Sequence, residues 1–120
     1  MARVEHLEIY KTSYNLLVTI IQVIRQFPKD FKFSLGNSLK TECIELVMDI
    51  YRANSTFKNR SEIIDRIIER INVIQLVIRL SKDLHFINVK KFSELANITD
   101  SIARQANGWN KFSKQTYGPE

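Results

Sequence analysis

The chain has 120 residues, of which 44% are hydrophobic and 26% charged, and this length predicts a single domain that can bury its own core. Three glycines and two prolines are too few for the regular turns of an all-β sandwich, and too few for the glycine-rich loop of a nucleotide-binding enzyme. Eighteen Lys and Arg residues against thirteen Asp and Glu give a net charge of +5, which suits an anionic partner without identifying one.

Apolar residues recur at helical spacing in four segments, separated by the few turn-forming residues. The first segment covers residues 4–27 and ends before Pro28, because a residue that precedes proline disfavours the helical conformation. Its predicted buried face consists of Tyr10, Tyr14, Leu17, Ile20, Ile21 and Ile24.

The second segment begins near Ser34, a residue type that caps helix N-termini. Its predicted buried residues follow a heptad-like spacing: Leu39, Cys43, Leu46, Ile50, Ala53 and Phe57. The third segment begins at Asn59, with Glu62 three residues later in the manner of a capping box, and ends near Leu84. Its predicted buried residues are Ile64, Ile67, Ile68, Ile71, Ile74 and Ile78.

The fourth segment is capped by Asn88, and Asn107-Gly108 is a candidate stop. Its predicted buried residues are Phe92, Leu95, Ile98, Thr99, Ile102, Ala106 and Trp109. Four helices with short links predict an all-α fold, an up-down-up-down four-helix bundle. We expect the bundle to cover residues 1–114 and a disordered tail to cover residues 115–120.

The second and third segments each carry a further apolar stripe opposite the predicted buried one. These residues are Ile44, Met48 and Tyr51 in the second segment and Val73, Leu76, Val77, Leu80 and Leu84 in the third. A small bundle cannot bury both sides of two helices, and an exposed apolar patch usually marks an interaction surface. We therefore expect an oligomer with these residues at its interface. The alternative is a monomer with a wide core face and scattered exposed apolar residues.

Residues that could carry catalysis or hold a metal are scarce. Neither His6 nor His85 follows a Glu at the spacing of bundle di-iron sites. The acidic residues, Asp49 among them, are interpreted as solvated or as helical pairs such as Glu62–Arg66. We expect no enzymatic activity, no metal and no cofactor.

The single cysteine, Cys43, excludes an intramolecular disulfide and lies on a predicted buried stripe, where a small hydrophobic residue is the ordinary interpretation. An enzyme that uses the Cys43 thiol is the competing hypothesis. The sequence shows no signal peptide and no apolar run near the roughly 20 residues of a membrane span. These features predict a soluble, cytoplasmic protein without a membrane partner.

The basic residues are spread along the chain rather than gathered in one arm. Arg79 stands out because it falls between the two apolar stripes of the third segment, where an ion pair and a phosphate contact are both possible interpretations. No recognition motif is present, so we expect salt-sensitive contact with the backbone of RNA or DNA. The candidate residues are Arg79, Lys82, Arg66, Arg70, Lys29, Lys32 and Arg52.

Two stretches carry a family resemblance: FPKDFKFSLGNSLKTECIELVMDIYRAN and VIRLSKDLHFINVKKFSELANITDSIARQANGW. They resemble the superfamily of four-helix bundles that contains proteins encoded in intervening sequences of bacterial large-subunit ribosomal RNA. Within it, Arg79-Leu80, the following Lys82-Asp83-Leu84 and Asn107-Gly108-Trp109 look like the accessory variability determinants (Avd) of diversity-generating retroelements. The resemblance covers about residues 8–112.

The resemblance implies a homopentameric, barrel-like assembly that binds nucleic acid through basic surfaces and associates with a reverse transcriptase. It also implies that the chain has no catalytic activity and that Arg79 matches a basic position in the family's third helix. The expected function is to dock the polymerase with its template RNA or cDNA, although family members are often more basic than +5 per chain. The alternative is an intervening-sequence-type bundle protein with an unknown structural role.

Overall fold

The computed structural model describes the backbone of residues 3–117 and the side chains of residues 3–114. Within this range every regular element is helical and there is no strand, which confirms the predicted all-α class. The elements in chain order are a 3-10 turn (Val4–His6), α1 (Glu8–Ile24), α2 (Lys29–Lys32), α3 (Leu35–Asn54), α4 (Arg60–Asp83) and α5 (Val89–Tyr117). None of the described helices is both long and apolar enough to cross a membrane.

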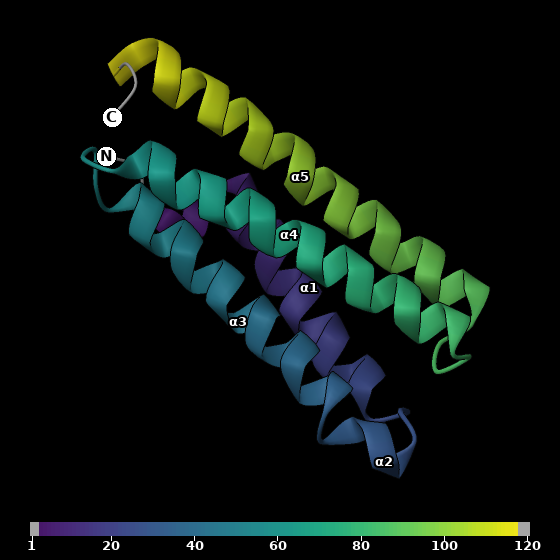
Figure 1. The fold of residues 1–120 in the computed structure, drawn as a ribbon. Helices are drawn as coiled ribbons and strands as arrows, with labels where there is room; N and C mark the ends of the chain where they lie inside the picture. Colours follow the sequence, from purple (N-terminus) through teal and green to yellow (C-terminus); the bar gives the residue numbers. More distant parts are fainter. Residues whose placement is uncertain (1–2, 118–120) are drawn as a thin grey trace.

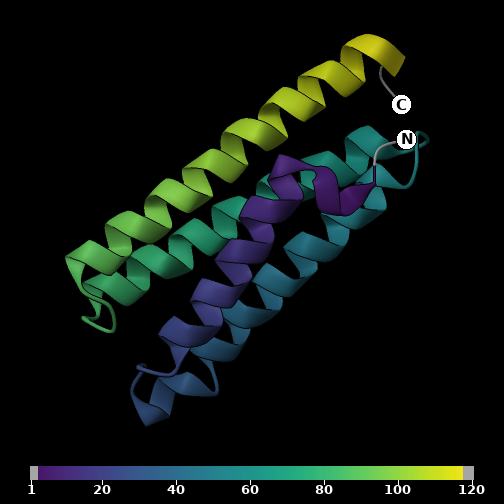
Figure 2. The ribbon, with the colours of Figure 1, turned by 180° about the vertical axis from the view of Figure 1, so that it is seen from behind.

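The four long helices run up, down, up and down along the chain (Figure 1). α1 contacts α3 and α5, and α4 contacts the same two helices, so the four helices close into a bundle. The short α2 and the α4–α5 link lie at one end of the bundle, and the α3–α4 loop lies at the other, as the view from behind also shows (Figure 2).

All four long helices contribute to the core, and the buried stripes predicted for the second and third segments form much of it. The α4 isoleucines predicted to be buried are at most 2% exposed, apart from the half-buried Ile68, and each such side chain contributes roughly 1.5–3 kcal/mol by leaving water. On α3 the prediction holds from Leu39 to Ala53. It is wrong for Phe57, which lies in the loop beyond the end of α3 and is exposed.

The predicted buried face of α1 is wrong by about one residue position. Tyr14 and Ile21 are exposed, and Tyr10 and Leu17 are only partly buried. The rings of Tyr10 and Tyr14 stack at the surface with their centroids 6.4 Å apart, where the hydroxyl groups can stay in water. The residues that α1 buries are Ile9, Ser13, Leu16, Ile20, Val23 and Ile24, so the prediction is confirmed only for Ile20 and Ile24.

Two of the helices begin where the sequence predicted, but without the capping hydrogen bonds that the sequence suggested. Ser34 and Asn59 occupy the N-cap positions of α3 and α4, yet neither side chain makes a capping hydrogen bond, so the predicted capping box with Glu62 is wrong. Asn59 instead adopts the left-handed conformation, with φ at 65°. Asn88 caps α5 as predicted, because its Oδ1 accepts the backbone N–H of Lys91 at 2.7 Å.

The ends of α4 and α5 differ from each other. His85 has φ at 63°, and the N–H groups of His85 and Phe86 donate to the carbonyl groups of Lys82 and Ser81 at 2.9 and 2.8 Å. This is a Schellman turn with histidine where glycine is usual.

The predicted stop at Asn107-Gly108 is wrong, because α5 continues through it to Tyr117. α5 thus includes part of the predicted tail, and residues 118–120 lie outside the described residues.

Candidate nucleic-acid interface and assembly face

Three of the candidate arginines converge on one buried carboxylate. The side chain of Asp49 on α3 is 1% exposed, and the distances from its oxygens are 2.8 Å to Arg52, 3.1 Å to Arg66 and 3.2 Å to Arg70. Arg66 and Arg70 reach it from α4, one helical turn apart, and Arg52 reaches it from one turn along α3. We call these four residues the Asp49 cluster.

Two further carboxylates complete the charge balance of the cluster. Arg70 donates to Glu42 at 3.0 Å, and Arg52 lies 3.7 Å from Glu45. Three guanidinium groups therefore face three carboxylates. Burial by itself raises the pKa of Asp49, but hydrogen bonds from Arg66 and Arg52 outweigh it and leave the pKa below its ordinary value.

The Asp49 cluster changes the interpretation of these residues. Asp49 is buried rather than solvated, although it does make a helical pair, with Arg52. In the described part of the chain Arg66 pairs with Asp49 rather than with Glu62. Arg70 is mostly buried, while Arg52 and Arg66 keep about half of their side-chain surface. Because Asp49, Glu42 and Glu45 already offset their charges, these three candidate arginines should attract phosphate less strongly.

Arg79 stands apart from the cluster. It is exposed, and within the described residues its side chain makes no ion pair or hydrogen bond. It lines a pocket of about 220 Å³ together with Asp100, but that carboxylate accepts a hydrogen bond from Gln75 at 3.1 Å. The nearby Lys82 lies 4.5 Å from the ring centre of Phe92 and 3.7 Å from Asp83. Phosphate contact by Arg79 stays a prediction.

The end of the bundle at α2 holds a second group of cations. Lys29 and Lys32 belong to α2, Arg25 follows the end of α1, and Lys40 lies on the second turn of α3. No member of this group, which we call the basic tip, makes an ion pair within the described residues. Lys29 and Lys32 were predicted candidates, whereas Arg25 and Lys40 were not among them. The available signal was four cations and one acid, Asp30, between positions 25 and 40.

The second apolar stripes lie on the surface, as the sequence predicted. We call the exposed members the α3/α4 apolar face: Ile44, Met48, Tyr51, Val73, Leu76, Leu80 and Leu84. Leu76 is the most exposed of them at 66%. Val77 was predicted to belong to this exposed stripe, but it is partly buried and packs against the core of the chain.

The structure offers little for catalysis in its described part. Burial raises the pKa of the Cys43 thiol to about 12 and the side chain is fully enclosed, so a reactive thiolate is disfavoured. No group of three potential ligands among the described residues could hold a metal ion.

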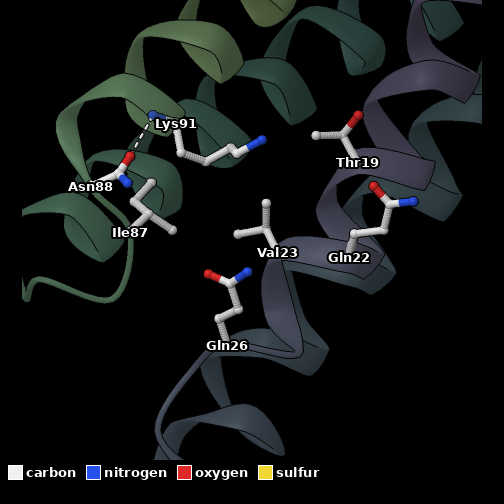
Figure 3. Close-up of a pocket in the computed structure, with 7 residues that line it drawn as sticks. All are labelled: Thr19, Gln22, Val23, Gln26, Ile87, Asn88 and Lys91. Atoms are coloured by element: carbon white, nitrogen blue, oxygen red, sulfur yellow. Dashed lines mark hydrogen bonds between the residues drawn. The ribbon is translucent and has the colours of Figure 1, made fainter.

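The pocket between α1 and the α4–α5 link, with a volume of about 290 Å³, is lined by Thr19, Gln22, Val23, Gln26, Ile87, Asn88 and Lys91 (Figure 3). Its polar groups are amides, one hydroxyl and the ammonium of Lys91, which pairs with Glu94 at 2.9 Å. This lining contains no carboxylate, thiol or imidazole, so it lacks a nucleophile with an adjacent base.

The comparisons with known proteins give one finding that bears on function. A family model described as bAvd-like matches residues 7–113, from the residue before α1 to near the end of α5. The search of the curated proteins finds no match. The match names the Avd-like branch of the predicted resemblance, and the intervening-sequence alternative stays a prediction.

Proposed function

The chain belongs to the bAvd-like family, and from this premise we propose that it is a non-enzymatic, oligomeric accessory protein of a diversity-generating retroelement. In this role it holds template RNA or cDNA electrostatically and docks a reverse transcriptase, which supplies the polymerase chemistry. The observation that carries the proposal is the α3/α4 apolar face, because it remains exposed on a protomer whose core is already complete.

Self-association is the simplest use of this face. Each protomer closes its own bundle, and the part of these apolar side chains that stays in water remains available to a partner. Burying them would contribute about 25 cal/mol for each Å² of apolar surface removed from water. The family resemblance suggests five copies, and five chains of charge +5 would give an assembly of about +25.

The unpaired cations support the nucleic-acid part of the proposal. Arg79 and the basic tip have no carboxylate partner among the described residues, so their charge is available to phosphate groups. Summed over an oligomer, such contacts would give binding that depends on salt rather than on sequence.

Template binding tests the proposal most directly. The purified protein should bind the retroelement's template RNA in about 50 mM salt and lose most of that affinity in about 200 mM salt. Light scattering on the same sample should report an oligomer, and a tagged reverse transcriptase from the same element should retain the protein on a column. A monomer that binds no RNA at low salt would overturn the proposal.

Leu76→Glu separates assembly from folding. We expect this variant to lose the oligomer while circular dichroism still reports a helical protomer, because Leu76 lies outside the core. Val89→Glu is the matched control, since Val89 is about as exposed as Leu76 but belongs to α5 and not to the α3/α4 apolar face. An unchanged mass for Leu76→Glu would contradict the proposed interface.

A further inference from the structure

Three of the four cations of the basic tip line a pocket that the proposed function leaves unused. It has a volume of about 210 Å³ and lies where the end of α1, the α2 turn and the first turns of α3 meet. Ile21 and Ile24 contribute apolar surface, and Arg25, Lys32 and Lys40 contribute cations. Phe33 and Asn37 complete the lining. The pocket therefore combines an apolar wall with positive charge and one aromatic ring.

Phe33 is the unusual member of this lining. The other two phenylalanines of the tip have packing roles, since Phe27 is buried and Phe31 lies 4.9 Å from the ring centre of Phe86. The Phe33 side chain is 71% exposed and stacks on no other described ring. Its backbone is nevertheless held in place, because its carbonyl group accepts a hydrogen bond from Asn37 Nδ2 at 3.2 Å. A flat apolar ring is thus exposed to water on a backbone that a hydrogen bond holds in place.

The charge around Phe33 is not offset by the protein. Arg25, Lys32 and Lys40 make no ion pairs within the described residues, in contrast to the three arginines around Asp49. Unpaired cations beside an exposed aromatic ring are the combination with which proteins hold single-stranded nucleic acid. The cations follow the phosphates, and the ring stacks against a base.

We infer that this pocket binds an unpaired nucleotide of a single-stranded nucleic acid. The base stacks on Phe33 beside Ile21 and Ile24, and the flanking phosphates contact Arg25, Lys32 and Lys40. A duplex keeps its bases stacked inside the helix and offers this pocket only its phosphates. The inference rests on the proposed function. It narrows the expected ligand from any nucleic-acid backbone to a nucleic acid with unpaired bases.

Phe33→Leu tests the stacking contact. The probe is a fluorescein-labelled oligouridylate, measured by anisotropy beside an RNA duplex of the same length. We expect the variant to bind oligouridylate about tenfold more weakly and to bind the duplex as the wild type does. Phe33→Tyr, which keeps an aromatic ring, should restore wild-type affinity. Phe112→Leu is the matched control, since Phe112 is also exposed but lies near the far end of α5.

Charge variants test the phosphate contacts of the same pocket. Lys32→Gln and Lys40→Gln should each lower the salt dependence of oligouridylate binding by about 0.7 in the slope of log K against log salt. Lys58→Gln is the control, because Lys58 lies exposed in the loop at the opposite end of the bundle. An equal effect of Lys58→Gln would show that net charge, rather than this pocket, determines binding, and would overturn the inference.

The outcomes separate the two proposals. Failure of the wild type to bind either RNA would overturn the proposed function and the inference with it. Binding of oligouridylate that Phe33→Leu leaves unchanged would overturn the inference alone. A changed oligomeric mass in Phe33→Leu would assign the ring to an assembly contact, and stronger binding to phosphatidylglycerol vesicles than to oligouridylate would assign the pocket to a lipid surface. Each of these two results would also overturn the inference.

Discussion

The Asp49 cluster and the basic tip contain the same kinds of residue in opposite electrostatic states. In the cluster, arginines from two helices surround a buried carboxylate, and Glu42 and Glu45 complete the balance. At the tip, four cations lie exposed or half-buried without an ion pair among the described residues. The first arrangement joins α3 to α4, and the second leaves charge for a partner. A count of basic residues therefore says little about which of them can bind phosphate.

Removing the carboxylate of Asp49 should have the largest effect on stability. Asp49→Ala leaves three guanidinium groups close together without their shared partner. Breaking a buried ion pair costs about 3–5 kcal/mol, and we expect the lower end of that range because Arg52 and Arg66 are half exposed. Urea unfolding followed by circular dichroism measures the loss. Asp30→Ala is the control at the tip, where the carboxylate makes no ion pair within the described residues. A loss below about 1 kcal/mol would show that the cluster is not structural.

Acid should weaken the cluster in a defined direction. The pKa of Asp49 is lower in the folded protein than in the unfolded chain, where an aspartate has a pKa of about 3.9. The stabilisation from Asp49 is therefore fully present above about pH 4 and is lost as the pH falls through the folded-state pKa. Asp49→Asn should flatten the fall in unfolding free energy below about pH 4. If Asp49→Asn lost unfolding free energy as steeply as the wild type below about pH 4, groups other than Asp49 would cause the acid sensitivity.

The geometry of the tip depends on close packing rather than on charge. A Cβ added to the buried Gly36 would lie 2.8 Å from Cγ2 of Ile24, a stiff β-branched side chain that packs between the end of α1 and the start of α3. Gly36→Ala should therefore cost about 1–3 kcal/mol despite the better helix propensity of alanine. It should also weaken RNA binding by moving Lys40 relative to Arg25.

Gly108→Ala is the matched control for this substitution. Gly108 lies in the middle of α5 with open space around its Cα, so alanine should stabilise the protein by about 0.5–1 kcal/mol. Equal effects of the two substitutions in thermal unfolding would contradict the close approach of α1 and α3 at the tip.

The sequence predicted the helices better than the relations between them. Periodicity was enough for the buried stripes of α3 and α4, because each helix has an unbroken run of well-spaced aliphatic residues. It was misleading for α1, where tyrosines at helical spacing lie outside the core and Ser13 lies within it. Gly108 was equally misleading, because the packing of α5 against α4 continues the helix through a residue that often ends one.

The candidate sites show the same limit. Arg66 and Arg70 reach Asp49 only because α3 and α4 lie side by side at this point, and no pattern within either helix reveals that contact. The pairing of Arg52 with Asp49 is different, because the two residues lie one turn apart on α3. Arg25 and Lys40 come together through the α2 turn, fifteen positions apart in the sequence. Exposure of the second apolar stripes was predictable, since it follows from the phase of a single helix.

The smallest effect on stability should come from removing charge at the tip. Lys29→Gln with Lys32→Gln deletes two cations that have no ion-pair partner among the described residues, so the unfolding free energy should change by no more than about 0.5 kcal/mol. Template RNA binding should weaken in the same variant and depend less on salt. Arg52→Gln should do the reverse, lowering stability more than binding, because its guanidinium already faces Asp49 and Glu45. If both variants lost stability and affinity in the same proportion, the distinction between structural and available cations would fail.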